Sequence, residues 1–522
     1  MGALTLKQFN NSIREWELSE GEGIDPTDSF GVDLRLSIRE NQIFLAEPYN
    51  PNTPWLTDRG RIFFDGMFDN NVSEKVEWNQ FFEYLSDFLY FTNHFSLKKK
   101  NSFFLIVLFE NISLEVLNML YILEQNNFFI KLRKVDNHYL NSDSESNFLL
   151  NNSTEKSKLH LSNLALLLNT DTRHEGYVLN LNLRLRFLKG DFKLLSIGSA
   201  LDITLPVYNL GSNISVLKSI NEGTHISCQD IKVSKFPILI TNTELFKRKN
   251  SKNLLSIFKT TNFLNNIWNG INVLNNNLSN AGVNLLNNFL PLSSEDYVNF
   301  LGFYSINAEL NSIGNFKKFV ELKLLNVSSV SKTKQLNIFL EQNVKSNNEF
   351  KSFKNYYYLP NNLFLEDNET YVNTQGLIKR TTKLLNFKKN SKSNWQIIRK
   401  IYSISKNLTY INKTSNLNYI DFEFINLFNY KNYINFQYFP SHNLVSFSFY
   451  LNKSNKMFIN NYNNNFKSVQ IKIFETKIKY WLDDFFVSNC RDSFSYNSSV
   501  LTNCSKISRS ISTNFFNFKY GY

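Results

Sequence analysis

A turn at residues 169–175, Asn-Thr-Asp-Thr-Arg-His-Glu, brings carboxylates, a guanidinium and an imidazole close together in the sequence. It follows the apolar run Leu164–Leu168, and open α/β sheets bind ligands at the carboxyl ends of such strands. A phosphate cradle at that place needs glycine, so that backbone N–H groups can approach the anion closely. This turn contains no glycine. We therefore expect Arg173 and Glu175 to pair and fix the turn, and we expect no cofactor there.

The sequence also lacks other motifs that would form a catalytic or metal site within one chain. The six histidines show no metal-ligand spacing, and there is no glycine-rich phosphate loop and no GxSxG nucleophile turn. The three cysteines, Cys228, Cys490 and Cys504, form no CxxC pair. An iron–sulfur or zinc site made by this chain alone is therefore not expected. We predict that the chain has no catalytic, cofactor-binding or metal-binding residues of its own.

The elements that must position the turn are predicted by apolar runs. Continuous apolar residues predict strands that are buried on both faces, and helix-length segments separate them. Ser113 precedes one such segment and is typical of a helix cap, with Glu115 in the first turn. Residues 179–186 alternate like a strand, but a parallel connection requires a helix there, so we predict a helix. The predicted strands are Phe103–Phe109, Leu164–Leu168, Phe192–Ile197 and Phe236–Thr241.

These patterns predict an α/β fold with doubly wound, mostly parallel sheets in two lobes, preceded by a β-rich segment. In that first segment, Asp33–Arg39 alternates polar and apolar residues, residues 40–42 predict a turn, and Ile43–Ala46 predicts a returning strand. We expect a β-rich N-terminal segment over 1–100, a first α/β lobe over 101–260, a second α/β lobe over 261–410 and a divergent C-terminal extension over 411–522.

Composition and charge restrict the partners. The formal net charge is +12, but the basic residues are spread out except at Lys98–Lys100 and between Lys379 and Lys400. This distribution favours a solvated surface or an acidic protein neighbour over nucleic acid. No apolar run is long enough to predict a membrane span. The 49 Phe and 25 Tyr against 17 Gly and 9 Pro indicate an A/T-rich, organellar gene.

Several separated motifs resemble one protein family. Residues 54–61, Pro-Trp-Leu-Thr-Asp-Arg-Gly-Arg, run into Asp65-Gly66, and residues 369–376, Glu-Thr-Tyr-Val-Asn-Thr-Gln-Gly, are followed by Trp395–Arg399. With residues 2–7 and 14–18, and with the closing stretch from Asp483 to Cys504, they resemble the large iron–sulfur subunit of respiratory complex I. The resemblance is to its second half, which is related to molybdopterin oxidoreductases.

The resemblance implies structural or interface roles for eight residues. The turn at 169–175 resembles a Gly-Thr-Asn-Pro-Arg-x-Glu turn of the family, with Asn169 in place of the glycine and Thr172 in place of the proline. On a continuous helix, three of the eight (positions 58, 61 and 65) would share one face as an ion-pair ladder. They would hold the N-terminal segment to its own domain or face the cluster-bearing half. The eight are Trp55, Asp58, Arg61, Asp65, Arg173, Glu175, Tyr371 and Asn373.

The function implied by the resemblance is that of a non-catalytic structural subunit in the peripheral arm of mitochondrial NADH:ubiquinone oxidoreductase, on the matrix side of the inner membrane. The iron–sulfur clusters are expected on a separate chain, the missing half of a split subunit. Other peripheral-arm subunits, including the flavin-bearing module that oxidises NADH, are the expected partners. Two alternatives remain: an active molybdopterin-dependent oxidoreductase, and a basic organellar RNA-binding protein.

Overall fold

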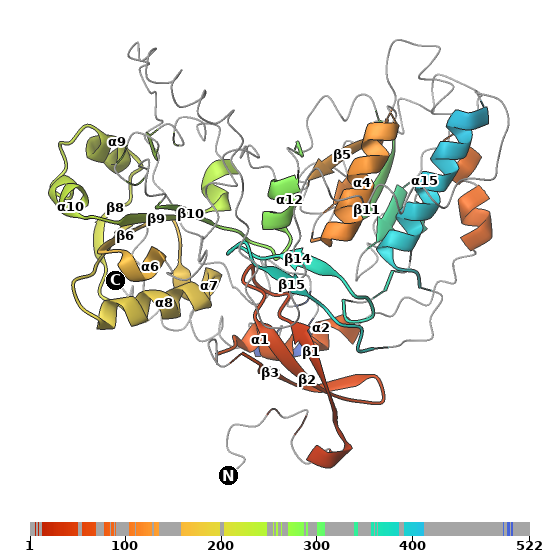
Figure 1. Cartoon of the computed structure of the whole chain (residues 1–522), viewed down its shortest axis with the longest axis horizontal. Coiled ribbons are helices and arrows are strands. Elements are labelled where there is room, and N and C mark those ends of the chain that lie inside the picture. The colour runs from red at the N-terminus through yellow and green to blue at the C-terminus, as the bar shows by residue number, and fades with distance from the viewer. Residues whose placement is uncertain are drawn as a thin grey trace, which may run out of the picture.

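The computed structural model describes the parts of the chain that form the N-terminal segment and two parallel sheets (Figure 1). Among these residues no helix is long and apolar enough to cross a membrane. The short helices among the described residues include η1 (Glu15–Glu17), η2 (Thr243–Lys247) and α12 (Asn280–Leu286). The main described ranges are 13–50, 55–68, 78–83, 104–109, 111–127, 130–134, 158–198, 203–247, 270–286, 300–307, 339–342, 356–359, 364–385, 391–411 and 498–501, with single residues between them.

The N-terminal segment is built on an antiparallel sheet, as predicted. Strands β1 (Ser19–Ile24), β2 (Asp33–Arg39) and β3 (Gln42–Pro48) pair in that order. The alternation of β2 buries Leu34, Leu36 and Ile38 against the short helices α1 (Asp58–Ile62) and α2 (Asp65–Phe68). The predicted turn is present, with positive φ at Glu40 and Asn41. The predicted strand, turn and returning strand are therefore confirmed.

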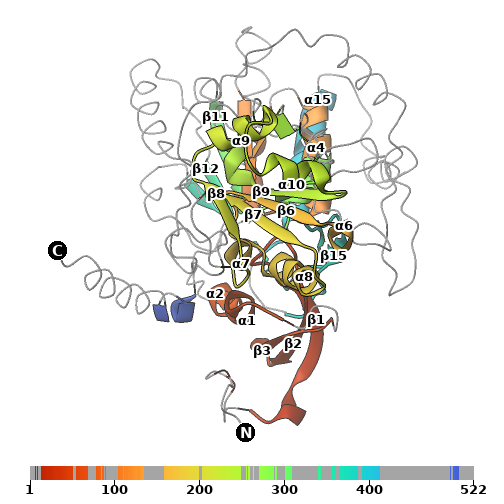
Figure 2. The ribbon, with the colours of Figure 1, turned by 90° about the vertical axis from the view of Figure 1, so that its left-hand side faces the viewer.

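One five-stranded parallel sheet lies in the middle of the sequence. Its order is β10-β9-β6-β7-β8, and it comprises β6 (Leu164–Leu168), β7 (Lys193–Ile197), β8 (Tyr208–Gly211), β9 (Pro237–Asn242) and β10 (Ile271–Leu274). Helices α6 (Lys158–Leu161), α7 (Thr172–Glu175) and α8 (Tyr177–Leu188) lie on one side, and α9 (Ser215–Asn221) and α10 (Cys228–Val233) on the other (Figure 2). All five residues of β6 are buried, because the sheet is covered on both faces.

The helix expected from connectivity is present. Residues 177–188 form α8, although their sequence alternates with the period of a strand. Val178, Leu179 and Leu183 of this helix are buried against the sheet. The parallel connection from β6 to β7 therefore outweighs the local pattern. The strands expected at 164–168, 192–197 and 236–241 are confirmed as β6, β7 and β9.

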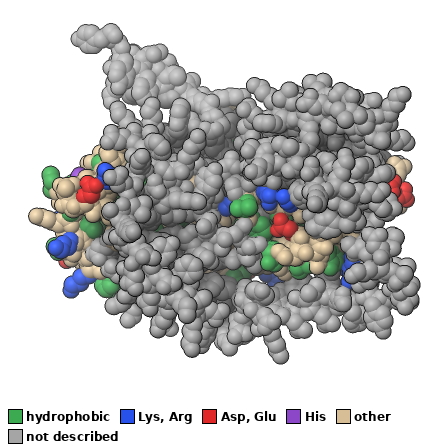
Figure 3. Space-filling view, turned by 90° about the horizontal axis from the view of Figure 1, so that it is seen from above, with side chains coloured by type: hydrophobic (Ala, Val, Ile, Leu, Met, Phe, Trp, Pro, Cys, Tyr) green, Lys and Arg blue, Asp and Glu red, His purple; other side chains and the backbone are tan. Residues whose placement is uncertain are grey.

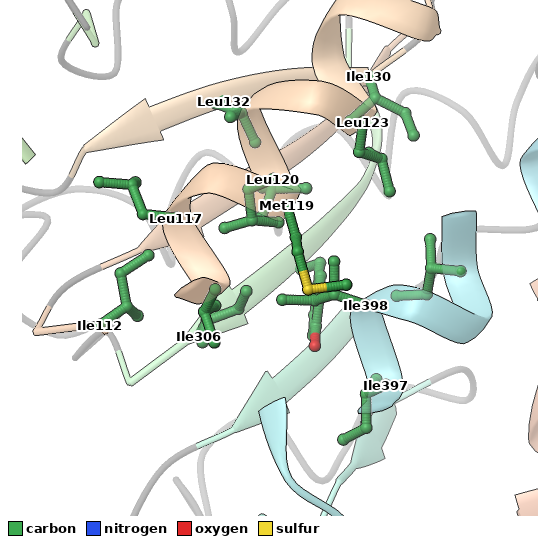
Figure 4. Close-up of a cluster of buried hydrophobic side chains, with 14 of the residues drawn as sticks. Ile112, Leu117, Met119, Leu120, Leu123, Ile130, Leu132, Ile306, Ile397 and Ile398 are labelled. Carbon is green, nitrogen blue, oxygen red and sulfur yellow. The ribbon is translucent and has the colours of Figure 1, made fainter. Parts of the chain in front are cut away.

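The other five-stranded sheet is also parallel, with the order β13-β12-β11-β4-β5. Helix α4 (Leu114–Asn126) packs on it beside α15 (Asn394–Ile411), and Figure 4 shows Met119 of α4 beside Ile398 of α15. Ser113 precedes α4 as predicted, but its side chain makes no capping hydrogen bond to the helix. The strands are β4 (Phe104–Phe109), β5 (Ile130–Lys134), β11 (Phe300–Ile306), β12 (Phe339–Gln342) and β13 (Tyr356–Tyr358).

Strand pairing crosses the boundary expected at residue 260. β10 follows that boundary yet pairs with β9, and β4 precedes it yet pairs with β11. The middle sheet is thus inserted between two parts of the other sheet. Local patterns identify strands but not their neighbours, which is why a division in chain order does not describe the sheets.

A hairpin joins these parts and is here called the clasp hairpin. It consists of β14 (Thr370–Val372), β15 (Ile378–Arg380) and the turn between them. It lies between the N-terminal sheet, α4 and α12 (Figure 1). Lys379 forms an ion pair of 2.7 Å with Asp33 of β2, and the backbone N–H of Thr370 donates to Glu115 of α4 at 3.1 Å. The hairpin therefore joins the N-terminal sheet to helix α4.

Candidate functional site

The candidate site is the crevice at the topological switch point of the middle sheet. The chain runs from β6 to β7 and β8, then returns to the other side of β6 with β9 and β10. Loops leaving β6 and β9 therefore part in opposite directions at the carboxyl ends of these strands. Open parallel sheets bind ligands at this place.

The turn after β6 begins with a residue in the left-handed conformation. Asn169 has a φ of 53°, the left-handed conformation in which glycine is most comfortable and asparagine is tolerated. The next residues form α7, whose cap is Asp171: its carboxylate accepts a hydrogen bond of 3.0 Å from the backbone N–H of Arg173. The same carboxylate lies 2.8 Å from Nδ1 of His174. The backbone N–H of Arg173 in this turn is therefore already bonded to the Asp171 carboxylate.

A buried hydrogen bond closes the crevice between the two strands. Nδ2 of Asn242, the last residue of β9, donates to Oε1 of Glu175 at 3.3 Å, and both residues are buried. The Thr170 hydroxyl, 2.9 Å from the Leu168 carbonyl oxygen, adds a 3.4 Å contact to the Ile240 carbonyl oxygen across the same gap. Arg173 is exposed, whereas both residues of this bridge are buried. The expected pairing of Arg173 with Glu175 stays a prediction.

Residues 25–32, here called the covering loop, lie over this edge of the sheet and are all buried. A Cβ added at Gly31 would come within 2.6 Å of the Leu278 side chain, in the loop after β10. A Cβ added at Gly176, between α7 and α8, would come within 2.9 Å of the Phe30 ring. Such close approaches show that the covering loop packs directly on the segments that leave β6 and β10.

The covering loop carries two buried acids that the sequence reasoning missed. Oδ1 of Asp28 accepts from the backbone N–H groups of Phe30 and Gly31 at 3.0 and 3.1 Å, and Asp25 holds Thr27 in the same way. Burial, and after it the charge of Asp25, raises the pKa of Asp28 to about 7 against the lowering effect of Arg59. The repeated Asp-x-Thr and Asp-x-Phe-Gly spacing, which is typical of Asx turns, was the available signal.

The second parallel sheet repeats the arrangement at its own switch point, between β4 and β11. Asn111 follows β4 with a φ of 42°, and Asn307 follows β11 with a φ of 51°. Nδ2 of Asn307 donates to the Asn111 carbonyl oxygen at 3.3 Å, and Asn361 donates to Asn307 at 3.1 Å. Both switch points are therefore bridged by asparagine side chains.

The residues at the middle sheet do not fit an anionic pterin dinucleotide. A phosphate needs backbone donors or cations, but the α7 turn is occupied by Asp171, and Glu175 spans the crevice to Asn242. The covering loop adds the buried carboxyl of Asp25, which would repel a phosphate placed beside it. Among the described residues, no cluster of three or more His, Cys, Asp or Glu could hold a metal ion.

The expected ladder on the N-terminal segment is broken by the chain's local structure. Asp58 and Arg61 lie on α1, but α1 ends at Ile62 and Asp65 begins a separate helix. The interruption lets two consecutive aromatics, Phe63 and Phe64, both enter the core. The prediction that the three charged residues share one continuous helix is therefore wrong.

Asp65 instead contacts residues near the C-terminus. Its Oδ2 accepts hydrogen bonds from the Ser498 hydroxyl at 2.7 Å, the Ser499 hydroxyl at 3.3 Å and the Val500 N–H at 3.2 Å. Two motifs that the resemblance singled out at opposite ends of the sequence thus meet. The remainder of that closing motif, at residues 483–493, lies outside the described residues, as does Cys490.

Of the remaining predicted residues, Trp55 is exposed on the surface, and Tyr371 and Asn373 lie in the clasp hairpin. The Trp55 side chain is 62% exposed, while its carbonyl oxygen accepts a hydrogen bond of 3.1 Å from the Tyr177 hydroxyl. Tyr371 and Asn373 are buried in the clasp hairpin, where the Tyr371 hydroxyl donates to Glu369. Burial raises the pKa of Glu369 to about 7, and the hydrogen bond from Tyr371 opposes this rise.

Comparisons with known proteins show what this chain is similar to. The family model described as molybdopterin oxidoreductase matches residues 69–404. The NADH-ubiquinone oxidoreductase 75 kDa subunit of Reclinomonas americana is 27% identical over 78% of this chain and 61% of its own length. The mitochondrial NADH dehydrogenase [ubiquinone] iron-sulfur protein 1 of Solanum tuberosum is 25% identical over 52% of this chain and 38% of its own length. Among solved structures, acetylene hydratase from Pelobacter acetylenicus is 10% identical with a TM-score of 0.48, over 75% of this chain and 70% of that one.

Proposed function

Because the chain belongs to the molybdopterin oxidoreductase family, we propose that it is a non-catalytic structural subunit of the peripheral arm of NADH:ubiquinone oxidoreductase. The names of its relatives support the assignment to this complex. The chain spans 61% and 38% of the length of those two relatives, so it corresponds to only a part of each of them. Its role in the complex is that of a rigid support for the electron-carrying parts.

The hydrogen bonds across the two switch points support the non-catalytic part of this proposal. An enzyme of this fold class would use the crevice between the diverging loops for its ligand. Here the Asn242–Glu175 and Asn307–Asn111 hydrogen bonds join the loops across both crevices. These amide contacts, buried at Asn242 and part-buried at Asn307, stabilise one arrangement of the two strands, and the protein's own side chains then occupy the crevice.

We further propose that the subunit is split and that a separate chain supplies its iron–sulfur half. A four-thiolate cluster needs four cysteines, and this chain has three, of which Cys228 and Cys504 are separate free thiols in the structure. The flavin-bearing NADH-oxidising module and other peripheral-arm subunits are the proposed neighbours. The A/T-rich composition supports a mitochondrial gene and a position on the matrix side of the inner membrane.

The test is purification from mitochondria through a tag on this chain, followed by mass spectrometry and an NADH oxidation assay. We expect an NADH-oxidising assembly that contains a cysteine-rich ferredoxin-like chain. Recovery of the chain without NADH oxidation, or with RNA whose removal by nuclease releases it, would contradict the proposal.

Metal analysis distinguishes a structural subunit from an active molybdopterin enzyme. The chain is expressed alone in a host that makes molybdopterin, and its molybdenum, iron and flavin are measured after purification. We expect each at far below one per chain. Stoichiometric molybdenum in well-folded protein would overturn the non-catalytic assignment, even if the chain also assembles with the complex.

A further inference from the structure

The amino ends of β7, β8 and β9 form an exposed surface at the edge of the sheet opposite the switch point. Three large apolar side chains are exposed there: Leu188 by 72%, Tyr208 by 66% and Val233 by 82%. Leu188 ends α8 just before β7, Tyr208 begins β8, and Val233 ends α10 just before β9. Because parallel strands begin at the same edge of a sheet, these residues come from three connections that meet at one end.

An ion pair holds the connections together. Nζ of Lys193, the first residue of β7, lies 2.7 Å from Oδ1 of Asp230 in α10. Asp230 raises the pKa of the Lys193 ammonium group above its usual value, and Tyr208 contributes in the same direction, which places Tyr208 near the pair. The start of β8, the start of β7 and α10 are therefore neighbours.

The remaining charge on this surface is mainly positive. Lys189, Lys232 and Lys235 are exposed beside the three apolar residues, whereas Asp230 is engaged by Lys193 and Asp191 is the other exposed acid nearby. We call the set of Leu188, Lys189, Tyr208, Lys232, Val233 and Lys235 the amino-end rim. Figure 3 shows hydrophobic, basic and acidic side chains interspersed at the end of the molecule that this lobe occupies in Figure 1.

We propose that the amino-end rim binds an acidic face of a neighbouring protein subunit. Large apolar side chains supply the anchors of protein interfaces, and complementary charges around them select the partner and its orientation. β8 adds an open edge, since in the described part of the chain it pairs only with β7. The inference rests on the proposed function, because the neighbour is a subunit of that assembly.

The mixture of side chains favours a protein over nucleic acid or a bilayer. Binding to a polyanion gains from uninterrupted positive charge, but Asp191 and the Asp230–Lys193 pair interrupt it here. The apolar residues also stand on two helices and one strand instead of on one amphipathic helix, which is the usual form of a bilayer-binding surface. An acidic protein surface with apolar contacts matches both features.

Amine footprinting of the intact assembly tests this surface. The assembly is purified through this chain, its lysines are labelled with an acylating reagent, and the labelled peptides are quantified before and after urea dissociation. Lys218 is the internal control, because it is exposed on α9 with Glu222 at 3.7 Å and lies outside the rim. We expect Lys189, Lys232 and Lys235 to gain about tenfold more label on dissociation than Lys218 does.

Each outcome bears on one of the two proposals. Equal labelling of rim lysines and Lys218 in an NADH-oxidising assembly overturns the rim inference alone. Failure to recover that assembly overturns the proposed function. Protection that disappears with nuclease or with detergent removal of lipid also overturns the inference, because the rim then binds RNA or lipid. A zero-length cross-link from Lys232 or Lys235 to a carboxylate of another subunit supports it.

A charge-reversal pair provides a second measurement. We expect Lys232→Glu with Lys235→Glu to reduce the recovery of the cross-linked neighbour by about tenfold, since like charges would then face each other. The matched control is Lys218→Glu, which leaves that recovery unchanged. Unchanged recovery in the double variant would overturn the inference. Because all three lysines are exposed, the folded chain tolerates these changes, and circular dichroism verifies this.

Discussion

The side-chain amide of Asn373 donates a hydrogen bond of 2.9 Å to the backbone carbonyl oxygen of Phe30, which lies 343 positions earlier in the chain. The same side chain accepts from the backbone N–H groups of Gln375 and Leu377 at 3.0 and 2.8 Å. Asn373 thus shapes the turn of the clasp hairpin and attaches it to the covering loop. The residue works as a structural tie between distant segments.

We expect Asn373→Ala to lower the free energy of unfolding by about 2–4 kcal/mol, because it leaves several buried backbone groups without partners. Urea unfolding of the purified chain, followed by tryptophan fluorescence, measures the change. Asn126→Ala is the control: its amide, at 3.3 Å from the Tyr402 hydroxyl, is exposed, and its loss should cost well under half as much. Equal effects of the two substitutions would contradict the assigned role.

Substitutions at two glycines distinguish the cost of backbone strain from the cost of disturbed packing at the covering loop. Gly31 and Gly190 both have positive φ, 55° and 82°, but only Gly31 faces a close neighbour, the Leu278 side chain. Alanine at either position costs about 1–2 kcal/mol for the left-handed backbone. We expect Gly31→Ala to cost about 1–3 kcal/mol more than Gly190→Ala because the loop must move off Leu278. Similar melting temperatures of the two variants would show that the loop does not pack there.

The clasp should weaken as pH rises. Glu369 has a pKa of about 7 in the folded chain against the ordinary 4.5 of a glutamate, because burial disfavours its charged form. The folded state therefore holds a proton that the unfolded state releases, so stability falls between these two pH values and stays low above them. We expect the chain to melt at a lower temperature at about pH 8 than at about pH 5.5.

Glu369→Gln should flatten this dependence, since glutamine keeps the shape and can still bond to Tyr371 but does not ionise. Thermal melting of both proteins across that range is the measurement. Glu222→Gln on exposed α9 is the control and should leave the slope as it is in the unmodified chain. A slope that survives in Glu369→Gln would assign the pH dependence to other groups, with Asp28 first among them.

Much of the middle sheet could be predicted because its strands are buried on both faces. Such strands are continuous apolar runs, as in Leu164–Leu168, and their boundaries follow directly from composition. The helix at 177–188 required one further rule, the handed crossover between parallel strands. The turn after β6 was also recognisable, because Asn169 stands where a left-handed residue is needed.

What could not be predicted depends on contacts between distant segments. Nothing local to Phe300–Ile306 indicates that it pairs with Phe104–Phe109 across the inserted sheet. The buried acids Asp25 and Asp28 lie in a stretch rich in turn residues, which reads as an exposed loop until the sheet edge beneath it is known. Asp65 was identified as important, but its partners at 498–500 belong to the other end of the chain.

The contact between Asp65 and Ser498 has a consequence for the making of the protein. Phe494 belongs to the core of the N-terminal segment, with its ring 6.3 Å from that of Phe63. A ribosome makes Phe494 long after Phe63, so this core stays open while the residues between them are translated. Until Phe494 packs against Phe63, that apolar surface is accessible to chaperones and proteases.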